Sequence, residues 1–371
     1  MRRVGPFILE RRRAPSRAVV IGVSVLAVLA ALLIMAIVFA GYGVNPWYAY
    51  ATIGKSTLGS RYGLMEILRR TIPLLLCGVG LVIAFRAQFW NIGAEGQLLA
   101  GAVAATGVAL YSGIPGPWLL PAMFGAGFLA GAVWGIIPAF LKVKLRVNDV
   151  ISTLMMNYIM IYIVDWLIHG PWKGPTMRGF AYTDIFPKDA WLPTLPLSRV
   201  HWPTLVIGVA AAILAALILS RTRLGYEIRV VGESEGAARY AGINFLRVSL
   251  AVMVLSGGLA GLAGVGEVAG IHHRLLSPTQ VSMGYGYTAI IVAWLARGSP
   301  GVAIVTSLFF GLIFAAGDVI KTVLRMPFQV TGVLNGLILF FLIGVEPLMY
   351  WRVRLLPKGE RWTGRAGSSG S

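Results

Sequence analysis

The feature that most constrains this chain is a succession of apolar runs, each long enough for a helix to cross the roughly 30 Å hydrocarbon core of a bilayer. Hydrophobic residues make up 57% of the 371 and charged residues only 12%, which is far from the balance of a soluble domain. We therefore predict an all-α integral membrane protein, a polytopic bundle of about ten transmembrane helices.

The boundaries of the apolar runs give the predicted spans. They cover residues 19–42, 64–85, 90–111, 117–140, 149–169, 203–220, 247–267, 283–297, 300–318 and 329–350. The eighth span is the least regular, because Gly284 and Gly286 open it and Pro300 follows closely. We expect this segment to be short or broken.

The distribution of positive charge orients these spans. Most of the 32 lysines and arginines fall on one side if both termini are cytoplasmic, as the positive-inside rule requires. The predicted organisation is a basic N-terminal tail over 1–18, a membrane domain over 19–350 and a C-terminal tail over 351–371. The loop 170–202 is then outside and the loop 221–246 is inside. The net charge of +18 thus reflects topology, and no nucleic-acid partner is expected.

One segment, FWNIGAEGQLLAGA, places three polar residues at the head of an apolar run: Asn91, Glu95 and Gln97. Burying an ionisable group at membrane depth costs at least about a few kcal/mol, so such residues usually face a bundle interior or an aqueous path. We predict that these three residues shape the substrate pathway. The alternative role for Glu95 is structural, as an acceptor for backbone amides.

The predicted span over 149–169 carries a polar stripe. Asp149, Thr153 and Asn157 recur every four residues, with Asn148 and Ser152 beside them, so one helix face meets protein or water. We add Asn148, Ser152, Thr153 and Asn157 to the candidate pathway. Hydrogen bonding between helices is the alternative explanation.

The inner loop contains the signals of a short helix. Ser234 is a suitable N-cap, Glu235 suits the first turn, and Gly242 can end the helix in a left-handed conformation. A capped, charged helix between two membrane spans indicates a docking element. A solvated connector is the alternative.

Several other patterns do not indicate chemistry. The segment 49–56, AYATIGKS, resembles a phosphate loop but has one glycine and no neighbouring strand, so no ATPase site is expected in this chain. Gly257 and Gly261 have the spacing of close helix contacts. His272 and His273 have no nearby cysteine, so no metal site is predicted. No catalytic residues are proposed.

Three ordered segments together resemble a known family. They are FWNIGAEGQLLAGA, RVNDVISTLMMNYI and VVGESEGAARYAGI, which begin at Phe89, Arg146 and Val230. Over residues 60–350 the chain is similar to the permease subunit of bacterial ABC importers for nucleosides and simple sugars, a branched-chain amino acid or ribose-like permease. Sugar-type permeases carry an aspartate-containing motif in place of the first segment, and this difference favours nucleosides.

The resemblance implies that this chain lies in the bacterial plasma (inner) membrane and works with three partners. These are a second, homologous permease in a heterodimer, a cytoplasmic ABC ATPase that binds ATP and Mg²⁺, and an extracytoplasmic substrate-binding lipoprotein. This chain itself would bind no cofactor and would work by alternating access. The implied ATPase coupling helix comprises Gly232, Glu233, Ser234, Glu235, Ala237, Ala238, Arg239, Tyr240 and Gly242.

The loop also departs from the family pattern, which has Asn-Pro followed by Glu where this chain has Ser234, Glu235 and Gly236. Gly236 lowers helix propensity by up to about 1 kcal/mol relative to alanine. The alternative function is a proton-coupled secondary transporter of a small polar solute. It would use Glu95, Glu267 and Asp318 as proton relays.

Overall fold

The computed structural model describes residues 2–4, 7–11, 17–175, 179–327 and 329–355. The chain forms two compact units, one of residues 1–50 with 324–371 and one of residues 51–323. Most of the predicted C-terminal tail, and part of the N-terminal tail, lie outside the described residues.

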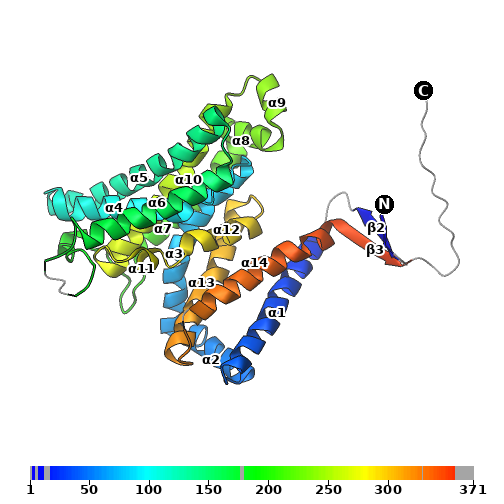
Figure 1. The fold of residues 1–371 in the computed structure, drawn as a ribbon, viewed down its shortest axis with the longest axis horizontal. Helices are drawn as coiled ribbons and strands as arrows, with labels where there is room; N and C mark the ends of the chain where they lie inside the picture. Colours follow the sequence, from blue (N-terminus) through cyan, green and yellow to red (C-terminus); the bar gives the residue numbers. More distant parts are fainter. Residues whose placement is uncertain (1, 5–6, 12–16, 176–178, 328, 356–371) are drawn as a thin grey trace. The chain divides into compact units, whose positions relative to one another are not determined.

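Helices make up most of both units (Figure 1). The smaller unit contains β1 (Arg2–Val4), β2 (Phe7–Arg11), α1 (Arg17–Gly41), α14 (Gln329–Tyr350) and β3 (Trp351–Leu355), and α2 (Pro46–Thr57) leads out of it. The larger unit contains α3 (Arg61–Arg86), α4 (Ala94–Tyr111), α5 (Gly116–Leu145), α6 (Asp149–His169), η1 (Lys188–Ala190), α7 (Trp202–Arg221), α8 (Arg223–Glu233), α9 (Glu235–Tyr240), α10 (Phe245–Glu267), η2 (Val268–His272), α11 (Pro278–Ser282), α12 (Tyr285–Leu295) and α13 (Pro300–Thr322).

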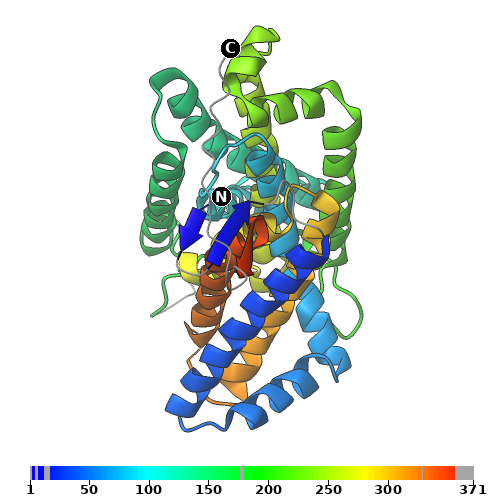
Figure 2. The same ribbon diagram turned by 90° about the vertical axis from the view of Figure 1, so that its right-hand side faces the viewer.

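In the smaller unit α1 and α14 lie side by side (Figures 1 and 2). One face of α1 is fully buried, because Ala27, Ala31, Met35 and Phe39 recur every four residues. The strands form an antiparallel sheet in the order β1-β2-β3. This small sheet is an addition to the predicted helical chain.

The break between α1 and α2 follows from local sequence. Gly43 adopts a φ of +75°, which a residue with a side chain rarely does. Asn45 then accepts a hydrogen bond from the Trp47 N–H at 2.9 Å, and Pro46 takes the first helical position, where its missing N–H costs nothing. The predicted first span therefore ends where the structure ends α1.

The centre of the larger unit is α3, in which 94% of the 18-residue apolar stretch is buried. It packs against α7, α10, α12 and α13. Gly80 permits the close approach of α10, since a Cβ there would lie 2.8 Å from the Ser256 carbonyl oxygen. Cys77 on the same helix is a free, buried thiol.

Small residues bring α5 and α10 into backbone contact. A Cβ on Gly261 would lie 2.1 Å from the Gly127 carbonyl oxygen, and one on Gly257 would lie 2.3 Å from that of Gly131. Any larger side chain would push the helices apart. The prediction that these glycines make close helix contacts is confirmed.

Six described helices are long and apolar enough to cross a membrane, or up to seven if α1 and α2 form one bent span. The six are α3, α5, α6, α7, α10 with η2, and α13. The predicted third span, α4, is not among them, and its first turn contains Glu95 and Gln97. The predicted eighth span is the short helix α12, of 11 residues. A bundle of ten transmembrane helices therefore stays a prediction.

The orientation of the bundle leads to a labelling prediction. The hairpin of α8 and α9 lies beside the end of α3, whereas Arg199 lies near its beginning. We expect Ser198→Cys to react with an impermeant thiol reagent from outside, and Ser234→Cys to react from the cytoplasm only. The buried Cys77 keeps the background low. The opposite pattern would invert the predicted topology.

Candidate functional site

The first polar site is the turn that joins α3 to α4. Asn91 is fully buried, and its amide nitrogen donates to Gln97 Oε1 at 2.9 Å and to Ser256 Oγ at 3.0 Å. Its amide oxygen accepts from the Gly93 N–H at 3.0 Å and from Gln97 Nε2 at 3.1 Å. Asn91 thus links the turn, α4 and α10 through a satisfied buried network.

The polar stripe on α6 packs against the same turn. Thr153 Oγ1 accepts from the Ile92 N–H at 3.1 Å. Asn157 accepts from the Gly96 N–H at 2.8 Å and donates to the Ile92 carbonyl oxygen at 2.9 Å. These side chains supply hydrogen bonds that the backbone of the turn cannot make to itself. The polar face of α6 therefore meets protein, in agreement with the alternative explanation that its side chains form hydrogen bonds between helices.

The remaining stripe residues surround the start of α6. Asp149 Oδ2 accepts from the Trp90 N–H at 2.8 Å and pairs with Lys142 Nζ at 2.6 Å. Ser152 donates to the Asp149 carbonyl oxygen at 3.2 Å. Asn148 is exposed and caps α6 by accepting from the Ile151 N–H at 3.2 Å. Asn148 is therefore a helix cap rather than a member of the buried stripe.

Glu95 caps a broken helix. The chain between α11 and α12 turns through Met283 and Gly284, with φ values of +46° and +77°. Glu95 is 3% exposed, and its Oε2 accepts from the Gly286 N–H at 2.8 Å, in the first turn of α12. A carboxylate at this position satisfies free N–H groups and complements the helix dipole. A Cβ at Gly286 would lie 2.3 Å from the Glu95 backbone nitrogen, so α4 and α12 touch directly here.

The cap leads to a prediction about Glu95. Glu95→Gln keeps an acceptor for the Gly286 N–H, whereas Glu95→Ala leaves that buried donor unpaired, at a cost of about 1–3 kcal/mol. We expect thermal stability to fall from wild type to Gln to Ala, and transport to fall in the same order. Asp189→Asn, at an exposed position in η1, is the matched control. Wild-type stability and transport in Glu95→Ala would remove this residue from the mechanism.

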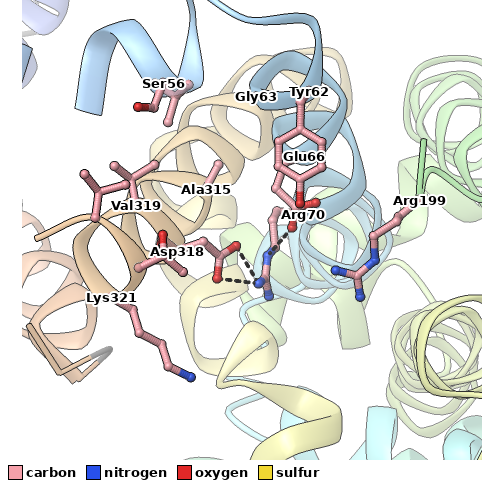
Figure 3. A pocket seen from close by; sticks show the side chains of 13 residues that line it. Ser56, Tyr62, Gly63, Glu66, Arg70, Arg199, Ala315, Asp318, Val319 and Lys321 are labelled. Carbon is pink, nitrogen blue, oxygen red and sulfur yellow. Dashed lines mark hydrogen bonds and ion pairs between the residues drawn. The ribbon is translucent and has the colours of Figure 1, made fainter. Parts of the chain in front are cut away.

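A second site lies at the opposite end of α3, where a pocket of about 400 Å³ opens (Figure 3). Arg70 is its central residue. One guanidinium nitrogen donates to both oxygens of Asp318, at 2.9 and 2.7 Å, and another donates to the Tyr285 hydroxyl at 2.7 Å. Its Nε lies 3.3 Å from Glu66. The lining is Ser56, Thr57, Tyr62, Gly63, Glu66, Arg70, Arg199, Ala315, Asp318, Val319, Lys321, Thr322 and Val323.

The charges around this pocket are connected. Arg69 pairs with Glu66, so two arginines hold one buried carboxylate while Arg70 also holds Asp318. The network joins α3 to α12 and α13. Sequence reasoning named Asp318 only as a relay and missed the arginines, although the spacing Glu66, Arg69, Arg70 places all three on one helix face.

Three further titratable groups, Glu267, His272 and His201, lie close to Arg69. Glu267 is 1% exposed, and among the described residues neither of its oxygens has a hydrogen-bond partner. His272 is the last residue of the π-helical turn η2, and its Nε2 lies 3.9 Å from Glu267 Oε2. Burial and the positive charge of Arg69 lower the pKa of His201 to about 3, so this imidazole is neutral at physiological pH. The region thus concentrates polar groups within an apolar bundle.

A third candidate site is the hairpin of α8 and α9. Ser234 ends α8 and caps α9 by accepting from the Ala237 N–H at 3.3 Å, as predicted. Gly242 has a φ of +72°, and the Ile243 N–H returns to the Ala238 carbonyl oxygen at 2.9 Å, which closes the helix end. The predicted cap, helix and stop are confirmed.

The remaining hairpin residues divide between packing and exposure. Ala238 is fully buried, whereas Tyr240 is 98% exposed. Glu235 and Arg239 form an ion pair at 2.6 Å on the surface of α9. Gly232 packs on the end of α3, and Glu233 is exposed. The hairpin therefore presents an ordered surface with an unpacked aromatic ring.

Several known proteins are similar to this chain in sequence. Residues 63–343 match the family described as branched-chain amino acid transport system / permease component. The glucose ABC transporter permease protein TsgB13 of Haloferax volcanii is 36% identical over 93% of this chain and 93% of its own length. The nucleoside ABC transporter permease protein NupB of Lactococcus lactis is 30% identical over 86% of this chain and 90% of its own.

A third relative is the guanosine ABC transporter permease protein NupP of Bacillus subtilis, which is 28% identical over 90% of this chain and 95% of its own. The match to the family covers the α3–α4 turn, the α6 stripe and the hairpin alike. A proton-coupled transporter is not favoured by this relationship. The chain belongs to the branched-chain amino acid transport system / permease component family.

Proposed function

We propose that this chain is the permease subunit of an ATP-driven importer that carries nucleosides or simple sugars across the bacterial plasma membrane. The observation that carries the proposal is the near full-length similarity to permeases whose names specify glucose, nucleosides and guanosine. These solutes are polar, hydroxylated and uncharged, so they need a polar path through an apolar bundle.

Partners follow from the same relatives. Haloferax volcanii holds a second similar permease protein, TsgC13, and Bacillus subtilis holds a second, NupQ. Paired permeases in one organism support a heterodimer for this chain. In our proposal a separate cytoplasmic ATPase binds ATP and Mg²⁺, an extracytoplasmic lipoprotein delivers the substrate, and this chain binds no cofactor.

The proposed mechanism is alternating access. ATP-driven closure of the ATPase pushes residues 232–242, at the tip of the hairpin of α8 and α9. The two permeases then change the side to which their shared path opens. The contact between Gly232 and the Arg86 carbonyl oxygen supports this route, because it connects α8 to α3 without an intervening side chain. The movement then reaches the helix that carries Arg70.

The polar side chains have separate roles in this proposal. Asn91, Gln97, Ser152, Thr153 and Asn157 keep the α3–α4 turn together with α6 and α10, and Asn148 caps α6. Glu95 fixes the start of α12, so the broken segment moves with α4. These residues shape the path by positioning its walls.

We further propose the Arg70 pocket as the place where substrate enters. The buried charges of Glu66 and Arg70 are paired, and Arg70 also pairs with Asp318, so the pocket presents oriented donors and acceptors without an isolated buried charge. Tyr62, which is 67% exposed, provides a ring for a sugar or a base. The volume of about 400 Å³ suits a monosaccharide or a nucleoside.

Reconstitution tests the function. The chain should be purified with its second permease, the ATPase and the binding protein encoded beside it, and placed in proteoliposomes. We expect guanosine or glucose to stimulate ATP hydrolysis and to accumulate inside only when ATP is supplied. A protonophore and an ATPase with an inactive catalytic glutamate are the controls. Uptake driven by a proton gradient without ATP would reject the proposal.

A further inference from the structure

A second pocket lies at the other end of α3, with a volume of about 340 Å³. It is formed by the last turn of α3, by α8 and by the turn between α12 and α13. Its lining consists of three arginines, one glutamate and four other residues: Phe85, Arg86, Gln88, Arg229, Gly232, Glu233, Arg297 and Gly298. It shares Arg229, Gly232 and Glu233 with the hairpin of α8 and α9 and no residue with the other two sites.

Two glycines hold Arg86 in place at this pocket. A Cβ on Gly232 would lie 2.0 Å from the Arg86 carbonyl oxygen, so α8 rests directly on the end of α3. Gly298 has a φ of +75°, and a Cβ there would lie 2.9 Å from Arg86 Nε. Three separate segments of the chain therefore converge on this one arginine.

The charges in the pocket are unbalanced. The Arg86 guanidinium is exposed, and among the described residues it has no hydrogen bond or ion pair. Arg229 donates to the Leu219 carbonyl oxygen, which does not neutralise its charge. Glu233 is the single carboxylate against three guanidinium groups. The pocket is thus built to receive an anion, and arginine forks suit a carboxylate in particular.

We propose that this pocket receives an aspartate or glutamate side chain of the cytoplasmic ATPase. The inference rests on the proposed function and adds a second contact to the α9 surface. The ATPase would then hold α3 directly at its end. Arg70 and Arg86 are both on α3, so about 24 Å of continuous helix would connect this contact to the Arg70 pocket.

Burial favours a protein carboxylate over a lipid phosphate. The 18-residue apolar stretch of α3 is 94% buried, whereas the corresponding stretches of α5 and α7 are 33% and 28% buried. The end of α3 therefore emerges among other helices rather than at the lipid-facing rim. The pocket also shares α8 with the hairpin, so an ATPase seated on α9 would lie next to it.

Affinity measurements with the complete permease pair in nanodiscs test the proposal. We expect Arg86→Glu to weaken ATPase binding by at least about tenfold and to flatten its dependence on salt, because like charges then meet at the contact. The ATPase affinity of Arg86→Gln should lie between those of the wild type and Arg86→Glu. Lys144→Glu is the matched control, since Lys144 is an exposed cation in the last turn of α5, outside this pocket, and should change affinity less than about twofold.

Crosslinking identifies the occupant. A photoreactive phenylalanine in place of Phe85, which lines the same pocket and leaves Arg86 intact, should crosslink to an ATPase peptide that contains aspartate or glutamate. Equal ATPase affinity of wild type and Arg86→Glu, or crosslinking to lipid alone, would overturn the inference. A wild-type permease that does not bind an ATPase at all would instead overturn the proposed function. The two failures are thus distinguishable.

Discussion

Arg70→Ala is expected to lower the free energy of unfolding by about 3–5 kcal/mol and to abolish transport, because it leaves Glu66 and Asp318 without their shared partner. Asp318 is one-third exposed, so water offsets part of the loss and the lower end of the range applies. Denaturation of the purified permease in detergent, together with an uptake assay, measures both effects.

A double variant separates charge from packing. Arg70→Met combined with Asp318→Asn removes both charges and should recover part of the stability that either single change loses, since buried pairs tolerate joint neutralisation. Lys321→Ala, at an exposed position in the same pocket, should have little effect on the free energy of unfolding. An Arg70→Ala protein as stable as wild type would show that the network does not support the fold.

Ala238→Pro is expected to abolish ATPase binding and ATP-driven transport while the membrane bundle stays folded. The Ala238 N–H donates to the Ser234 carbonyl oxygen at 3.0 Å, and proline removes this donor and clashes with the preceding turn. The cost in a helix interior is about 3 kcal/mol or more. α9 has only six residues, so it cannot retain its shape. Pull-down of the ATPase and gel filtration of the permease measure the two outcomes.

Glu235→Pro is the matched control for this change. Glu235 is the first residue of α9, where proline is well tolerated, and Ser234 before it has the extended backbone that a following proline prefers. We expect this variant to bind the ATPase nearly as well as wild type. Wild-type binding and transport in Ala238→Pro would exclude the hairpin as the element that transmits ATPase closure.

The sequence predicted those helices that are stabilised or recognised by features of a single segment, such as caps and apolar runs. The α9 helix follows from Ser234, its extended N-cap, and Gly242, its left-handed stop. Apolar runs predicted the long spans α3, α5, α6, α7, α10 and α13 within a few residues, because hydropathy and length are properties of one segment. The glycines of α10 likewise indicated close packing before their partners were known.

Only the tertiary structure could assign partners to the polar residues. The sequence marked Glu95, Asn91 and the α6 stripe as unusual, because each is costly in lipid without a partner. It could not say that Glu95 caps α12, 191 residues along the chain, or that Asn157 holds the turn before α4. Such contacts depend on how helices pack, which a single-segment pattern does not record.

The charged network around Arg70 could not be predicted from the local sequence either. Glu66, Arg69 and Arg70 stand at the start of an apolar helix, where charges ordinarily reach the membrane surface. The fold instead buries them against Tyr285 and Asp318 from two distant helices. The sequence by itself determined the class, the family and the local helices of this protein. The tertiary structure decided which polar groups meet, because long-range packing alone brings their partners within hydrogen-bonding distance.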